Sequence, residues 1–175
     1  GFIFDCQREY PLALNYYERA RKIRERMGLE VDLAESYNNI GHIYASRSEF
    51  EQALQYYQHA QEILARLGLE VNLAKTYNNI GLLYTLQKNL ILALRYYEQA
   101  REIQERLRLE VDLARTYTNV GVIYAAQKNA DQALWFYEHA RKIQDRLGLK
   151  TPLAITFSHL GHLYYEQGDY KKAEQ

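Results

Sequence analysis

Three side chains near the C-terminal end of the sequence have the spacing of metal ligands. His159, His162 and Glu166 are three and four residues apart, so a helix would place them on one face. Imidazole nitrogens and a carboxylate are ligands that zinc accepts, but a complete site needs a further ligand from a second segment, and none stands out. We therefore expect no metal, and we expect the two histidines to hydrogen-bond or stack at a binding surface.

Other reactive groups are isolated. Cys6 is the only cysteine, so the chain can form neither an internal disulfide nor a zinc-type Cys/His set. The nine glycines include no phosphate-binding loop, and no nucleophile elbow is present. The sequence predicts no catalytic constellation and no cofactor, so we expect a protein that is not an enzyme.

The amino-acid composition argues for some kinds of binding partner and against others. The 175 residues carry 22 basic and 22 acidic side chains, and this balance argues against a phosphate-binding surface for nucleic acid. No apolar run approaches the ~18 residues of a membrane span. The single cysteine fits a reducing compartment, so we expect a cytoplasmic protein whose partner is a protein or peptide.

A 40-residue period without insertions organises the chain, and repetition of this kind is typical of stacked structural units. The first recurring block has five residues: an aromatic residue, two polar residues, an aliphatic residue and a glycine. It occurs at Tyr37–Gly41, Tyr77–Gly81, Tyr117–Gly121 and, more loosely, Phe157–Gly161. A second block pairs alanines with aromatics: Ala53, Tyr57 and Ala60 with their equivalents. Both blocks have helical spacing.

The repeat predicts paired helices. First helices are expected near 31–46, 71–87, 111–127 and 151–167, and second helices near 10–27, 50–67, 90–107 and 130–147. Glycine in a helix costs ~1 kcal/mol, so Gly41 and its equivalents indicate close contact between helices. Gly28, Gly68 and Gly148 suit left-handed helix ends, where the third repeat has Arg108 instead. Pro11 and Pro152 suit first turns of helices.

The order Tyr37, Ile40-Gly41, Tyr44, Ala53, Tyr57 and Ala60 resembles the tetratricopeptide repeat (TPR) pattern. The usual repeat has 34 residues, so this chain resembles the long-repeat branch, which includes kinesin light chains, Pins-type regulators and bacterial signalling regulators. The resemblance implies an all-α fold, a right-handed superhelical solenoid of antiparallel helix pairs, whose first helices line a concave face.

The domain prediction is a single TPR array over 1–175. It contains partial repeats at 1–33 and 154–175 and full repeats at 34–73, 74–113 and 114–153. Neither end shows the polar capping face of a terminal repeat. We expect a fragment of a longer array, with end-to-end self-association through the uncapped terminal repeats as an additional partner mode.

The predicted binding surface is the face of each first helix opposite the core stripe. Sixteen of the seventeen tyrosines fall in repeating columns, most of them packing columns, and Tyr165 alone is expected on the groove face. The candidate residues are Asn38, Asn39, His42, Lys75, Asn78, Asn79, Leu82, Leu86, Arg115, Asn119, Val122, Ser158, His159 and His162. An apolar floor of Leu82, Leu86, Val122, Ala125 and Ala126 lies between the amides.

Amides that donate and accept at once, above an apolar floor, suit a bound peptide. The alternative is that the asparagines bind neighbouring helices of the same chain. Lys75 and Arg115 are expected at the groove edge, where they could contact acidic ligand residues. The sequence thus predicts a scaffold that binds a linear peptide or helix. The competing hypothesis is a sensor or oligomerisation segment of a multidomain signalling protein, contacting other domains of the same protein.

Overall fold

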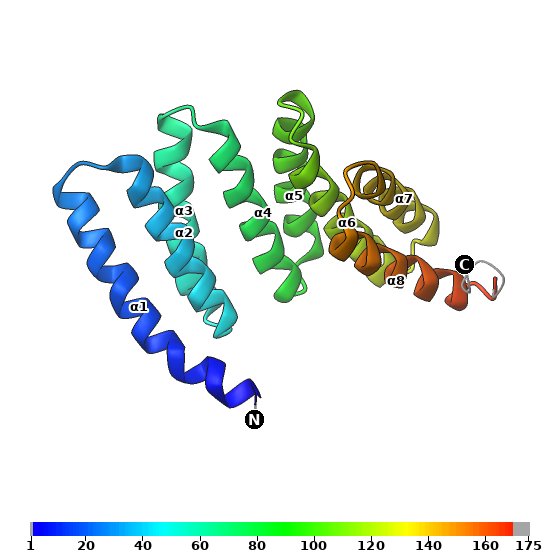
Figure 1. Ribbon diagram of the computed structural model, residues 1–175, viewed down its shortest axis with the longest axis horizontal. Helices are drawn as coiled ribbons and strands as arrows, with labels where there is room; N and C mark the ends of the chain where they lie inside the picture. Colours follow the sequence, from blue (N-terminus) through cyan, green and yellow to red (C-terminus); the bar gives the residue numbers. More distant parts are fainter. Residues whose placement is uncertain (1, 170–175) are drawn as a thin grey trace. The chain divides into compact units, whose positions relative to one another are not determined.

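The computed structural model describes the backbone of residues 2–169 and the side chains of residues 10–169. Within this range the chain is all helix, with no strand (Figure 1). The helices are α1 (Phe2–Arg26), α2 (Glu30–Ser46), α3 (Phe50–Arg66), α4 (Glu70–Leu86), α5 (Leu90–Arg106), α6 (Glu110–Ala126), α7 (Ala130–Arg146) and α8 (Lys150–Glu166). The prediction of an all-α fold built from consecutive helix pairs is confirmed, and none of these helices combines the length and apolarity needed to cross a bilayer.

The N-terminal boundary differs from the expectation. α1 starts at Phe2, well before the predicted start near residue 10, and Pro11 lies inside the helix rather than in its first turn. A proline removes one backbone hydrogen bond but does not force a helix to stop, so the residues before it can still be helical. Pro152 does lie in the first turn of α8, as predicted.

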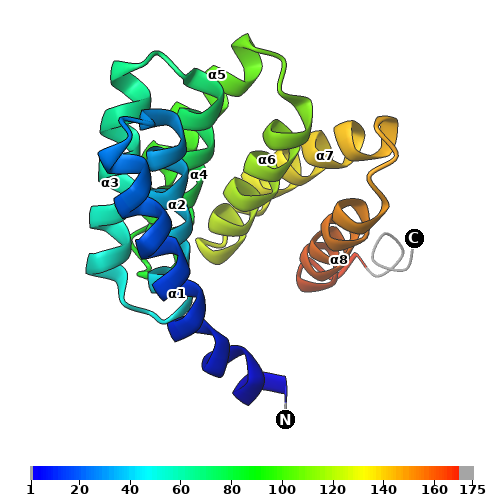
Figure 2. The same ribbon diagram turned by 60° about the vertical axis from the view of Figure 1, so that its left-hand side comes forward.

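The chain forms two compact units, residues 1–88 with α1–α4 and residues 89–175 with α5–α8. In the first unit, α2 packs against α1 and α3, and α3 packs against α4. In the second unit, α6 packs against α5 and α7, and α7 packs against α8. Figure 2 shows α6, α7 and α8 of the second unit. Short turns join α7 to α6 before it and to α8 after it.

Close contact between first and second helices explains the recurring glycines. A Cβ on Gly41 would lie 2.8 Å from the ring of Tyr57 and 3.2 Å from the carbonyl oxygen of Ala53. A Cβ on Gly121 would lie only 2.6 Å from the ring of Tyr137. Both tyrosines are almost fully buried, so the rings occupy the space that a larger residue would need. The predicted reason for glycine is confirmed at these two positions.

Most aromatic residues of the first helices are less buried than expected, although Tyr117 is buried, as predicted. Tyr37 and Tyr44 are half-buried, and Phe157 is 48% exposed. Tyr44 stacks on Tyr56 with ring centroids 5.4 Å apart, and Tyr37 lies 6.0 Å from the same ring. These rings therefore cover the edge of the helix contact, while Tyr57 and its equivalents fill the centre.

The turns follow the sequence signals. Gly28, Gly68 and Gly148 have φ between 67° and 68°, and Arg108 adopts φ 54° at the equivalent place. The backbone N–H of Leu109 donates to the carbonyl of Gln104, which closes the helix end around this left-handed residue. A side chain at Arg108 pays a steric penalty that the three glycines avoid.

Candidate functional site

A groove between α2 and α4 is the candidate site of the first unit that contains residues of the predicted binding surface. It has a volume of about 330 Å³ and is open to solvent. One side of α2 and one side of α4 form its walls, and the buried Leu64 of α3 forms its floor. The lining residues are Val31, Glu35, Asn38, Leu64, Asn72, Lys75 and Asn79.

Helical spacing places these side chains on the two walls. Val31, Glu35 and Asn38 recur at i, i+4 and i+7 along α2, and residues 72, 75 and 79 recur at i, i+3 and i+7 along α4. Leu64 is 1% exposed and belongs to a core cluster with Ala34 and Ala60, so the floor is rigid and apolar.

Asn38 lines the groove, but its amide is used inside the protein. Its Nδ2 donates to Thr76 Oγ1 at 3.0 Å and to the carbonyl of Ala34 at 3.3 Å. Thr76 is fully buried on α4, and its hydroxyl has two partners, the amide of Asn38 on the neighbouring first helix and the carbonyl of Asn72 on its own helix. A related contact joins Thr118 and Thr156, whose hydroxyl oxygens lie 3.3 Å apart between α6 and α8.

Asn78 is the main correction to the predicted surface. It was expected on the open face, but it is 4% exposed, and its Nδ2 donates to the carbonyl of Ala74 at 3.4 Å. For Asn38 and Asn78, therefore, the amides act within the helix array, which was the alternative interpretation of the asparagine column. The period alone does not separate the two roles, because both place the residue on the same side of a helix.

The groove also contains polar groups that have no partner. Asn72, Lys75 and Asn79 make no side-chain hydrogen bond or ion pair within the part of the chain that the structure describes. Across the groove, the carboxylate of Glu35 lies 3.9 Å from the guanidinium of Arg24. One wall thus presents a partly paired carboxylate, and the other presents a free ammonium between two free amides.

Three residues of the groove were not predicted. Val31 and Asn72 lie on α2 and α4, N-terminal to the residues assigned to the binding face, and Leu64 lies on α3. A detectable signal existed for Asn72, which shares a helical stripe with Lys75 and Asn79. No comparable signal existed for Leu64, because it lies on a second helix and reaches the groove only through the packing of α3 beneath α2 and α4.

The remaining polar candidates have varied environments. Arg115 forms an ion pair with Asp112, with 2.6 Å between a guanidinium nitrogen and a carboxylate oxygen. It is therefore less available to a ligand than Lys75. Ser158 donates to the carbonyl of Ala154 on its own helix. Asn39 and Asn119 are half-buried, while His42 is exposed.

The apolar candidates divide between surface and core. Leu82 and Leu86 are exposed on α4. Val122 instead packs, with Ala125, against the buried cluster of Ala133, Tyr137, Leu160 and Leu163. The predicted floor is therefore partly a core surface in the second unit.

The two histidines of α8 have separate contacts. His159 stacks on Tyr137 with ring centroids 5.2 Å apart and an angle of 7° between the planes. Burial there, with a smaller contribution from His162, lowers the pKa of His159 below its ordinary range. The Nδ1 of His162 lies 3.8 Å from a carboxylate oxygen of Glu166. Among the described residues, no group of three His, Cys, Asp or Glu side chains has the arrangement of a metal site.

The consecutive helix pairs and the 40-residue repeat define a helical-repeat protein, and a comparison with protein families agrees with this class. The sequence profile of the tetratricopeptide repeat family matches residues 32–106 and 112–175. The chain belongs to this family. No curated protein matches the sequence.

Solved structures with this fold are numerous. BtubC (BKLC) from P. vanneervenii superposes with a TM-score of 0.74 at 23% identity, covering 95% of this chain and 84% of the other. A Rap protein complexed with Competence and Sporulation Factor gives a TM-score of 0.82 at 21% identity, covering 99% and 48%. Aspartyl phosphate phosphatase F from Bacillus subtilis gives 0.88 at 18% identity, covering 96% and 44%. This chain thus spans less than half the length of the last two proteins, and at these identities the likeness concerns the fold.

Proposed function

We propose that the chain is a protein-interaction scaffold that binds a linear segment of a partner protein in the groove between α2 and α4. The observation that carries this proposal is the set of unpaired polar groups, Asn72, Lys75 and Asn79, beside the apolar floor of Leu64. Amides can satisfy the N–H and C=O groups of a peptide backbone, and an apolar floor accepts its side chains.

The charges of the groove predict the chemistry of the segment. Lys75 makes no ion pair among the described residues, whereas Glu35 already has Arg24 beside it. An acidic side chain of the ligand therefore gains a partner at Lys75, while a basic one competes with Arg24 for Glu35. We expect a segment with an acidic residue close to an apolar one.

A binding role is supported by the Rap protein of similar fold, whose structure was solved in complex with Competence and Sporulation Factor. The single cysteine is consistent with binding in the reducing cytoplasm. The alternative is that the segment that occupies the groove belongs to another domain of the same protein.

A peptide selection tests the proposal. Random twelve-residue peptides displayed on phage would be selected against the folded chain, and the enriched sequences titrated by calorimetry. We expect acidic and apolar residues to be enriched, and we expect Lys75→Met and Asn79→Ala each to weaken binding about tenfold, as the loss of ~1–3 kcal/mol implies.

The matched control is Lys142→Met, which removes an exposed lysine from α7 and leaves the groove unchanged. Circular dichroism would verify that all three variants keep their helix content. Selected peptides that bind the Lys75 and Asn79 variants with unchanged affinity would show that the α2–α4 groove is not the binding site.

A further inference from the structure

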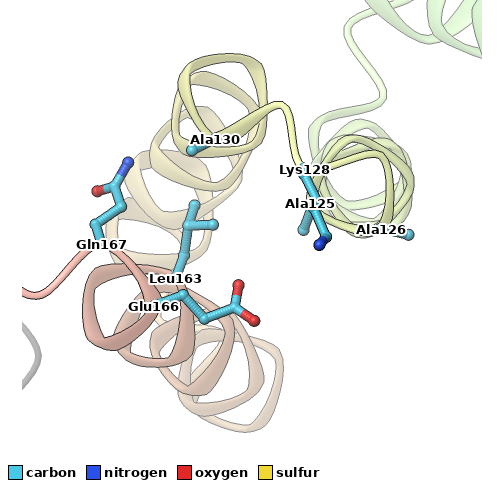
Figure 3. A pocket seen from close by; sticks show the side chains of 7 residues that line it. All are labelled: Ala125, Ala126, Lys128, Ala130, Leu163, Glu166 and Gln167. Carbon is cyan, nitrogen blue, oxygen red and sulfur yellow. The ribbon is translucent and has the colours of Figure 1, made fainter.

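A second hollow lies in the other unit, between the C-terminal ends of α6 and α8. Its volume is about 600 Å³, and the turn between α6 and α7 closes one side (Figure 3). The bottom is apolar, and two charged side chains stand at the rim. The lining residues are Ala125, Ala126, Lys128, Ala130, Leu163, Glu166 and Gln167.

The repeat explains why there is room here. Ala130 is the first residue of α7, and the equivalent positions forty residues apart hold Phe50 at the start of α3 and Leu90 at the start of α5. Both larger residues are partly buried. In the third full repeat the methyl group of alanine stands where the other two full repeats have a benzyl or isobutyl group. This repeat therefore lacks a large apolar side chain at the start of its second helix.

The walls suit the missing side chain. Leu163 is 4% exposed and belongs to the buried cluster beneath the hollow, so it forms a fixed apolar surface. In Figure 3, Leu163 points toward Ala130, while Ala125 lies on the side of α6 that faces them. Apolar surface left open in this way is a favourable place for an apolar group of a partner.

The rim fits a peptide unit. Lys128 and Glu166 extend toward the hollow from opposite sides in Figure 3. Lys128 makes no ion pair among the described residues, and Glu166 has only the ring of His162, 3.8 Å away. An amino acid residue within a chain offers one N–H and one C=O, which a carboxylate and an ammonium group can bind respectively. The equivalent residues of the first unit, Ser48 and Leu86, do not provide this pair of charges.

We propose that this hollow binds one phenylalanine- or leucine-sized side chain of a partner segment, with Glu166 accepting from its backbone N–H and Lys128 donating to its C=O. The inference rests on the proposed function in that the ligand is a peptide segment. It adds the identity of an anchor side chain, and it concerns residues that the α2–α4 groove does not contain.

The experiment uses a minimal probe in place of the unidentified partner. The ¹⁵N-labelled chain would be titrated with N-acetylphenylalaninamide and followed by amide chemical shifts, with N-acetylalaninamide as the control ligand. We expect the phenylalanine compound to shift the amides of residues 125–130 and 163–167 in a saturable way, and the alanine compound to bind at least tenfold more weakly.

Two substitutions copied from the sibling repeats complete the test. Ala130→Phe and Ala130→Leu place in α7 the residues that start α3 and α5, so each should fill the hollow and abolish the shifts while the chain remains folded. Glu166→Gln should weaken binding of the phenylalanine compound and leave the hollow open. Equal shifts with both compounds, no shifts at these amides, or unchanged binding in the filled variants would overturn the proposal. Because Lys75→Met leaves this hollow untouched, failure here and failure of the α2–α4 groove are separate results.

Discussion

The contact between Gly121 and Tyr137 offers a test in which two effects have opposite signs. Replacing Gly121 with alanine should stabilise an isolated helix by ~1 kcal/mol, because alanine is the better helix former. In this structure, however, the new methyl group would lie 2.6 Å from two atoms of the Tyr137 ring and 3.1 Å from a third. Tyr137 is only 2% exposed, so the ring has no free space into which it can turn.

The magnitude follows from the balance of these terms. Inserting a carbon into a well-packed contact costs ~1–3 kcal/mol. After subtracting the gain in helix propensity, we expect Gly121→Ala to lower the free energy of unfolding by up to about 2 kcal/mol. For a chain of this size that corresponds to a fall of about 4–8 °C in the melting temperature.

The assay is a double-mutant cycle measured by urea and thermal unfolding. In a Tyr137→Leu background the ring is absent, so Gly121→Ala should recover its propensity gain and become stabilising. A change of sign between the two backgrounds identifies the helix contact as the cause. If Gly121→Ala stabilises the otherwise unchanged chain, the close approach of α6 and α7 is not the reason for glycine.

Two further predictions concern a turn and a histidine. Arg108→Gly should raise the free energy of unfolding by about 0.5–1 kcal/mol, because glycine adopts φ 54° without the steric cost of a side chain. The reciprocal change Gly148→Arg should lower the free energy of unfolding. Variants that melt at the same temperature as the unchanged chain would contradict this prediction. Since the pKa of His159 is lowered by burial, the unfolded chain binds its proton more tightly, so the free energy of unfolding should decrease as the pH falls below about 6.5. His159→Phe, which can keep the stack on Tyr137, should flatten this decrease in chemical unfolding curves, and an unchanged pH dependence would refute the assignment.

Parts of the site could be read from the sequence and parts could not. Lys75 and Asn79 were predicted on a groove face and do line the α2–α4 groove, because helical spacing alone fixes which residues share a side of α4. Asn38 and Asn78 have the same spacing, yet their amides bond within the array. Whether an amide binds a ligand or a neighbouring helix depends on the distance to that helix, which no single-helix pattern contains.

The sequence by itself determined the repeat, the helix pairs and the glycine contacts. A 40-residue period with apolar residues at helical spacing can bury its apolar stripes only by stacking helices, and glycine leaves room for an aromatic ring on the facing helix. Tertiary structure alone decided the floors and openings. Leu64 reaches the α2–α4 groove from a third helix, and the small side chain of Ala130 lines a hollow because α8 leaves the space beside it open. Such features depend on how side chains from three separate helices share one volume, and that volume is set when the helices pack.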